Sequence, residues 1–177
     1  MRSFVAAAFI IVMLPSLAQA QKTSYDYDKA ANFSTYKTYT LKDGTKVGDP
    51  LIDNRIVAAL EAELKLKGLT RSDASPDLAV VYHVAFDKQK DITAYSSGMS
   101  GGYYRWGGGW GTTDVRVNEI LVGTLMIDMA DQRKNEMVWR GVGVKEVDTT
   151  AKPEKRDKSI QKAVQKILKN YPPKVKK

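Results

Sequence analysis

Two segments of the chain carry apolar residues at the three-to-four-residue spacing of an amphipathic helix. The first begins at Asp49-Pro50, where the aspartate can cap the helix and the proline suits the first helical position, and it ends at Gly68. Its apolar face consists of Ile52, Ile56, Leu60 and Leu64. The second begins at Pro153, ends at Pro172-Pro173, and has the apolar face Ile160, Val164, Ile167, Leu168 and Tyr171. We predict two helices, each packed on a core through one face.

Other segments alternate polar and apolar residues with the two-residue period of a strand. Two are short, residues 23–28 and 36–41, and three are long, residues 77–95, 115–129 and 137–147. In the last, we predict that Val138, Val142 and Val144 point inward, with Gly141 and Gly143 leaving gaps on the other face. Neighbouring strands joined so simply favour antiparallel pairing. The order of elements predicts an α+β fold of two layers, a mostly antiparallel sheet with two amphipathic helices packed on one face.

Residues 1–20 have the three regions of a secretory signal peptide. A basic start at Arg2 precedes an apolar run from Phe4 to Leu14, and Ala18-Gln19-Ala20 is a cleavage site. The alternatives are a short membrane anchor or a buried N-terminal helix. We expect cleavage after Ala20, a single domain over 21–173, a basic tail over 174–177, and a periplasmic location. The mature chain has no apolar run long enough for a transmembrane segment.

Composition removes several kinds of chemistry. The chain has no cysteine, which excludes a disulfide, a thiol nucleophile, a thiolate metal site and lipid attachment at a cleavage-site cysteine. No phosphate-binding loop or dinucleotide fingerprint is present, and Asp26-x-Asp28 lacks the rest of a calcium loop. We therefore predict no cofactor and no metal. His83 is the only histidine and is interpreted as a structural or rim residue, and Glu119 is the acid to examine first. No catalytic residue is assigned.

The net charge of +8 is unevenly distributed. From residue 21 to 144 there are 16 basic and 16 acidic residues, whereas residues 145–177 hold 11 basic and 4 acidic residues. A basic C-terminal segment on a neutral body favours weak attraction to anionic lipids or glycans over a nucleic-acid partner, although such a segment is also typical of a solvated helix face.

Residues 96–113 combine seven of the thirteen glycines with two tyrosines and two tryptophans. This connection is much longer than the usual hairpin loop of about two to five residues. In one interpretation the rings fold back on the sheet. In the other they form a contact surface for a glycan, a lipid headgroup layer or a partner protein. The candidate binding residues are Tyr103, Tyr104, Arg105, Trp106 and Trp110.

Several segments together resemble the bacterial family of domain of unknown function 4136. They include Asp49-Pro-Leu-Ile-Asp-Asn-Arg55, Pro76-Asp-Leu-Ala-Val-Val-Tyr-His83, Gly123-Thr-Leu-Met-Ile-Asp128 and Val138-Trp-Arg-Gly141, in this order and over nearly all of the mature chain. The resemblance implies an exported envelope protein of Gram-negative bacteria, often a lipoprotein, with no established activity and no assigned functional residues. The missing cysteine departs from the lipoprotein members.

Three functions remain open at this point. The first is a non-enzymatic binding or accessory module of the envelope that uses the loop 96–113, with an anionic lipid, a glycan or an envelope protein as partner. The second is a hydrolase of an envelope polymer with the loop as a lid, which requires a cleft with convergent carboxylates. The third is a structural subunit that assembles through a sheet edge. The sequence does not give the oligomeric state.

Overall fold

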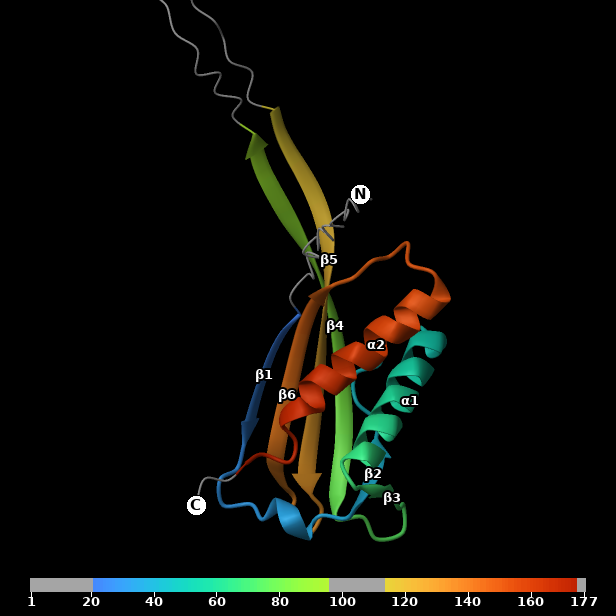
Figure 1. Ribbon diagram of the computed structural model, residues 1–177, viewed down its shortest axis with the longest axis vertical. Helices are drawn as coiled ribbons and strands as arrows, with labels where there is room; N and C mark the ends of the chain where they lie inside the picture. The colour runs from blue at the N-terminus through green and yellow to red at the C-terminus, as the bar shows by residue number, and fades with distance from the viewer. Residues whose placement is uncertain (1–20, 96–113, 175–177) are drawn as a thin grey trace, which may run out of the picture.

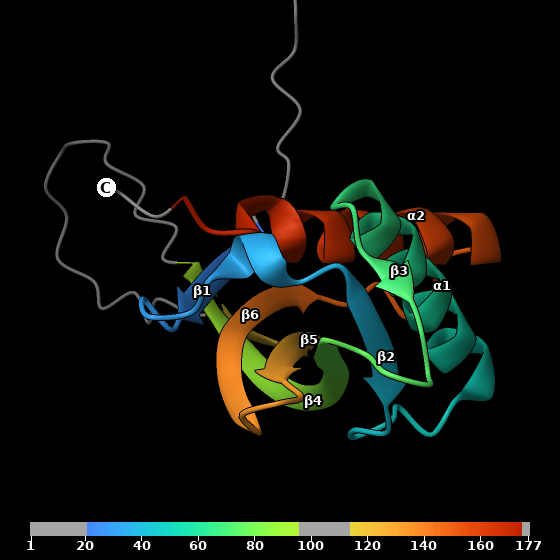
Figure 2. The same cartoon turned by 90° about the horizontal axis from the view of Figure 1, so that it is seen from below.

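The computed structural model describes residues 21–95 and 114–174. One sheet forms the body, and both helices cover the same face of it (Figure 1). Seen along the strands, the helices lie side by side above the sheet, and β6, β5 and β4 curl beneath them (Figure 2). The predicted two-layer α+β fold is confirmed.

The sheet has six strands in the order β1-β6-β5-β4-β2-β3. Their bounds are β1 Lys22–Tyr27, β2 Thr38–Lys42, β3 Thr70–Arg71, β4 Leu78–Tyr95, β5 Asp114–Asp131 and β6 Glu136–Glu146. The helices are α1 Pro50–Leu66 and α2 Pro153–Ile167, with short 3-10 turns η1 Phe33–Thr35 and η2 Leu168–Asn170. All pairs are antiparallel except the two made by β2, which runs parallel to β3 and β4.

The ends of α1 follow from its sequence. The Asp49 side chain accepts a hydrogen bond of 2.9 Å from the backbone N–H of Leu51 at the N-terminus. Gly68 adopts a φ of 82° after the C-terminus, a conformation that costs glycine least. The predicted start and end of this helix are confirmed.

The core lies between the helices and the half of the sheet drawn lower in Figure 1. Leu60 and Leu64 of α1 are completely buried, as are Val164 and Leu168 of the C-terminal segment. Trp139 of β6 is buried beneath them and meets the Tyr171 ring edge-on, with ring centroids 5.6 Å apart. Every residue of the two predicted apolar stripes except the first of each, Ile52 and Ile160, is therefore buried in the core.

Val138 of β6 is buried in the core as predicted, but the faces predicted for the rest of the strand are wrong. Gly141 and Gly143 lie on the helix-covered face, where a β-carbon at either position would come within 3 Å of Ile167 on α2. Val142 and Val144 lie on the open face and are only partly buried. The two glycines let α2 approach the sheet closely, so the gaps are filled by the helix.

The β4–β5 hairpin extends well beyond the other elements (Figure 1). β6 pairs with β5 from Asp131 as far as Val122 and no farther. Within the described chain, residues 88–95 of β4 and 114–121 of β5 therefore have no other strand beside them in the sheet. We call this two-stranded part the arm. Its last pair is Tyr95 with Asp114, so the loop 96–113 leaves and re-enters the described chain at that end. None of the helices in the described ranges is long and apolar enough to cross a membrane.

Candidate functional site

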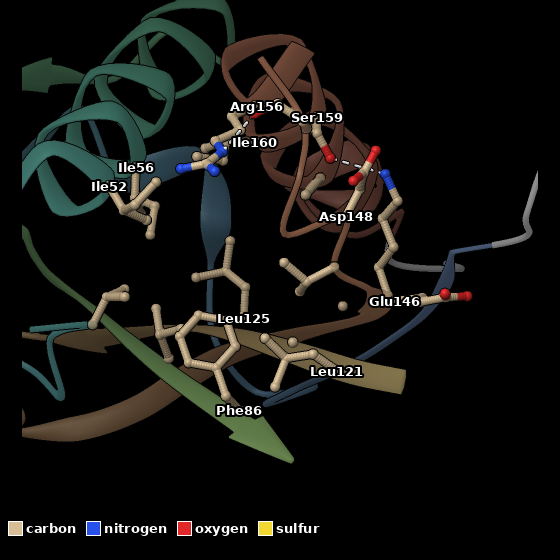
Figure 3. A pocket seen from close by; sticks show the side chains of 18 of the residues that line it. Ile52, Ile56, Phe86, Leu121, Leu125, Glu146, Asp148, Arg156, Ser159 and Ile160 are labelled. Carbon is tan, nitrogen blue, oxygen red and sulfur yellow. Dashed lines mark hydrogen bonds between the residues drawn. The ribbon is translucent and has the colours of Figure 1, made fainter. Parts of the chain in front are cut away.

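The two helices and the sheet enclose a groove where the arm leaves the body. Its volume is about 660 Å³, within the range of small-molecule sites. In Figure 3, side chains of β4 and β5 form its floor, and the two helices form its roof. Its apolar lining residues include Ile52, Ile56, Val84, Phe86, Leu121, Leu125 and Ile160.

The groove exists because each apolar helix stripe serves two purposes. In α1, Leu60 and Leu64 are buried in the core, but Ile52, two turns earlier on the same face, is only partly buried and lines the groove. In α2, Val164 and Ile167 are likewise buried in the core, whereas Ile160, earlier on the same face, is only partly buried and lines the groove. Each helix therefore packs most of its apolar stripe on the sheet, while the first residue of the stripe extends over the groove.

A short network of hydrogen bonds fixes the groove's edge beside α1. The Tyr82 hydroxyl donates to Asp53 Oδ1 over 3.1 Å, and the same oxygen accepts the backbone N–H of Val47 over 3.1 Å. Burial, together with the bond to the Asp53 carboxylate, raises the pKa of Tyr82 to about 12. Tyr82 therefore stays protonated at neutral pH, and Val47 is held as part of the groove wall.

Phe86 is the most informative residue of the floor. Its side chain points into the groove (Figure 3), yet the residue keeps 47% of its surface exposed. Burying a phenylalanine side chain contributes about 1.5–3 kcal/mol, so an exposed one inside a concave apolar site favours a ligand that covers it.

Charged residues surround this apolar interior. Those from β6, α2 and their connection are Lys145, Glu146, Asp148, Lys155, Arg156, Lys158 and Lys162, and Asp49 stands at the start of α1. Five of these eight residues are basic. The exposed Lys158 and Lys162 place part of the basic C-terminal segment along the groove.

Two of the rim residues are tied into local structure. Lys155 Nζ lies 2.8 Å from Asp148 Oδ2, and this bond, with those from Thr150, lowers the pKa of Asp148 to about 2. Arg156 donates to the backbone oxygens of Thr149 and Ala151, at 2.9 and 3.0 Å, and so fixes the connection between β6 and α2. The ion pair and these hydrogen bonds therefore hold this part of the rim in place.

His83 and Glu119 are not brought together. His83 lies on the open face of the sheet, where Nδ1 accepts the backbone N–H of Thr45 over 3.1 Å and Nε2 lies 3.9 Å from Asp128 Oδ2. Arg140 holds that aspartate through two hydrogen bonds of 2.6 and 2.7 Å. These contacts agree with a structural histidine, and His83 does not line the groove.

Glu119 is exposed and lines a second hollow of about 420 Å³ beside the groove, together with Glu146 and Asp148. Among the residues that the structure describes, no group of three or more histidine or acidic side chains is arranged to hold a metal ion. The candidate binding residues Tyr103, Tyr104, Arg105, Trp106 and Trp110 lie outside the described residues.

The groove is not visible in the sequence. The stripe from Ile52 to Leu64 predicts one continuous core contact, and nothing in the pattern shows that Ile52 is left at the edge of a groove. One signal was available: apolar Phe86 is followed at once by the charged run Asp87-Lys-Gln-Lys90, which marks where the strand leaves the core.

The fold and the groove together define a small α+β module with a ligand-sized apolar groove under its helices. Residues 23–173 match the family described as domain of unknown function (DUF4136), and the chain belongs to that family. The resemblance found in the sequence is therefore confirmed.

Solved structures share this fold at low sequence identity. A PDZ domain protein from Parabacteroides distasonis is 19% identical, with a TM-score of 0.56 over 86% of this chain. The present chain spans 35% of that protein's length. The PelC dodecamer from Paraburkholderia phytofirmans is 10% identical, with a TM-score of 0.50 over 84% of this chain and 95% of its own. No curated protein matches the chain.

Proposed function

We propose that the protein is an exported envelope protein that binds amphiphiles, with an acyl chain in the groove and an anionic headgroup at the basic rim. The observation that carries this proposal is the partly exposed Phe86 on the floor of an apolar groove of about 660 Å³. The proposal makes the module a binding protein without catalytic chemistry.

The lining favours an acyl chain over a sugar. Aliphatic side chains from both layers dominate it, and among the described residues that line it Phe86 alone is aromatic. Sugar sites need aromatic faces for stacking and several convergent hydrogen-bond partners, whereas an acyl chain needs only apolar area.

The rim favours an anionic headgroup. Lys158 and Lys162 are exposed and line one side of the groove with positive charge. Asp148 on that side is already paired with Lys155. A phosphate or carboxylate headgroup would gain charge-assisted hydrogen bonds there.

The signal peptide predicted at residues 1–20 supports export, and envelopes supply such amphiphiles. Residues 96–113 are then a second envelope contact at the end of the arm, through Tyr103, Tyr104, Arg105, Trp106 and Trp110. Their tyrosine and tryptophan content suits a lipid headgroup layer.

The test compares two lysophospholipids with the same acyl chain, lysophosphatidylglycerol and lysophosphatidylcholine, titrated calorimetrically below their micelle concentrations. Phe86→Asp should weaken binding of both about tenfold or more, because a charge replaces apolar floor area. The double substitution Lys158→Glu, Lys162→Glu should weaken only the anionic lipid.

Leu66→Asp is the matched control for the apolar change, since Leu66 is also exposed but lies at the far end of α1 from the groove. Lys169→Glu is the control for charge. Absence of binding to either lipid, or equal losses in the control variants, contradicts the proposal.

A further inference from the structure

β1 is an open edge of the sheet. It pairs with β6 on one side, and no strand of the described chain pairs with its other side. All but one of its residues, from Lys22 to Asp26, are exposed. The strand lacks the proline or bulge that usually protects such an edge, and β3, at the opposite edge, is only two residues long.

Alternation along β1 decides which backbone groups face outward. The N–H of Asp28, next beyond the strand, donates to Val138 O on β6 over 2.9 Å. Because successive residues of a strand direct these groups to opposite sides, Ser24 and the other even-numbered residues of β1 direct their N–H and C=O groups to β6, as Asp28 does. Thr23, Tyr25 and Tyr27 therefore direct theirs away from the sheet.

Tyr27 differs from the other two. Its N–H is already bound by the Asp26 side chain, with 2.9 Å between the nitrogen and Oδ1. The outward N–H and C=O groups of Thr23 and Tyr25 are therefore the pairing groups that this edge offers.

We propose that a second copy of this chain pairs with β1 in antiparallel fashion, with the two-fold axis at Ser24. Thr23 then lies opposite Tyr25 of the partner subunit, and the two residues exchange both backbone hydrogen bonds, twice across the axis. The pairing joins the two sheets into one continuous sheet.

This register is also complementary in charge. It places Lys22 opposite Asp26 of the partner subunit on the open face of the sheet, once on each side of the axis, and both side chains are exposed. Opposite charges in directly facing positions stabilise a strand pair. An axis at Thr23 pairs no opposite charges, and an axis at Tyr25 requires the Tyr27 N–H that Asp26 occupies.

The helix-facing side of the edge adds apolar area. Tyr25 is 45% exposed and stacks on Tyr27, with ring centroids 6.2 Å apart and planes within 11°. The pre-ordered Tyr25 ring would cover Thr23 of the partner subunit. One strand pair buries less area than a standard interface, so the dimer is expected to be weak and concentration-dependent.

The first test introduces a single cysteine into this cysteine-free chain. Ser24→Cys places two thiols across the axis at a facing pair about 4.5 Å apart in Cα positions, which suits a disulfide. Mild oxidation should convert this variant to a covalent dimer, whereas Ser75→Cys, on an exposed loop, should stay monomeric. Equal cross-linking of both variants, or none in Ser24→Cys, overturns the proposal.

The second test uses charge complementation, measured by sedimentation over about a hundredfold range of concentration. Lys22→Glu alone and Asp26→Lys alone each set like charges opposite one another and should weaken dimerisation about tenfold. Mixing the two variants restores opposite charges at both positions and should recover association within about threefold of the wild type.

A mixture that associates no better than its components, or a wild type that stays monomeric throughout, overturns the proposal. None of the residues Lys22–Tyr27 lines the groove. Lipid binding and dimerisation can therefore fail independently in these experiments.

Discussion

Gly141 shows how much the contact between α2 and the sheet depends on a missing side chain. A β-carbon there would collide with the Trp139 ring and come within 2.6 Å of Ile167 Cγ2. We expect Gly141→Ala to lower the free energy of unfolding by about 2 kcal/mol, because overpacking forces the helix away. Val142→Ala, on the open face, should cost less than about 1 kcal/mol. Urea unfolding measures both, and equal losses would contradict the assignment of faces.

Asp77 ties β2 to the turn after β5. Its carboxylate accepts hydrogen bonds from the backbone N–H groups of Lys37 and Thr38, and from the side chains of Thr38 and Arg133. These bonds, led by the one from Lys37, lower the pKa of Asp77 to about 2.

The lowered pKa of Asp77 makes the free energy of unfolding depend on pH. The carboxylate stabilises the fold above its ordinary pKa near 4, and this contribution of about 2 kcal/mol disappears as the pH falls from about 4 to 2. Asp77→Asn should therefore destabilise the protein at pH 6 but change little at pH 2, in urea titrations at both values. Asp87→Asn, on an exposed residue, serves as the control.

Single residues of β6 are the hardest to place from the sequence. Alternation correctly separates Val142 and Val144 from the neighbouring glycines, but it cannot say which set a helix covers. It also misses the register shift between β5 and β6, at which Val138 is buried in the core. Valines normally mark the buried face. Here the covered face needs small residues, because α2 lies so close that Ile167 fills the space above them.

The two ends of α1 share one apolar stripe but have different roles, one in the core and one in the groove. Leu64→Ala should cost about 3 kcal/mol, because the side chain is fully buried and leaves a cavity. Ile52→Ala should cost less than about 1 kcal/mol but weaken lysolipid binding, since this residue lines the groove. Thermal unfolding and titration separate the two effects, and similar stability losses would mean that no groove exists at that end.

The arm and the loop it carries can be separated by design. Tyr95 and Asp114 form the last strand pair, so residues 96–113 can be replaced by Asn-Gly, which closes a two-residue hairpin. We expect an unchanged midpoint of thermal unfolding and a loss of association with anionic liposomes. If liposome association survives the replacement, the groove or the basic helix is responsible for it, and not residues 96–113.

Periodicity predicts most elements but not their neighbours. Both helices and the three long strands are found near their predicted places, because each has a sustained apolar pattern. β1 and β2 are close in sequence, yet three strands separate them in the sheet, and β2 pairs in parallel with β4. Those positions depend on contacts across the molecule, as does the groove, and no local pattern encodes them.

On the scale of the whole molecule, charge is segregated toward one end of the chain. Residues 145–177 hold 11 basic and 4 acidic residues, and the helix α2 within them forms one side of the groove. Raising the salt concentration from about 0.05 to 0.5 M should weaken binding of lysophosphatidylglycerol several-fold, because exposed lysines are screened. Lysophosphatidylcholine binding should hardly change in the same titration, and an equal response would remove the role given to the rim.

The β4–β5 hairpin keeps one register through 18 successive pairs, from Leu78–Asp131 to Tyr95–Asp114. Two residues added to each strand would lengthen the arm by about 7 Å and leave every side chain on its original face. One residue added to a single strand would instead create a bulge and turn the arm. Proteins with this fold can therefore differ in reach, in steps of paired insertions, without any change in the body that anchors the arm.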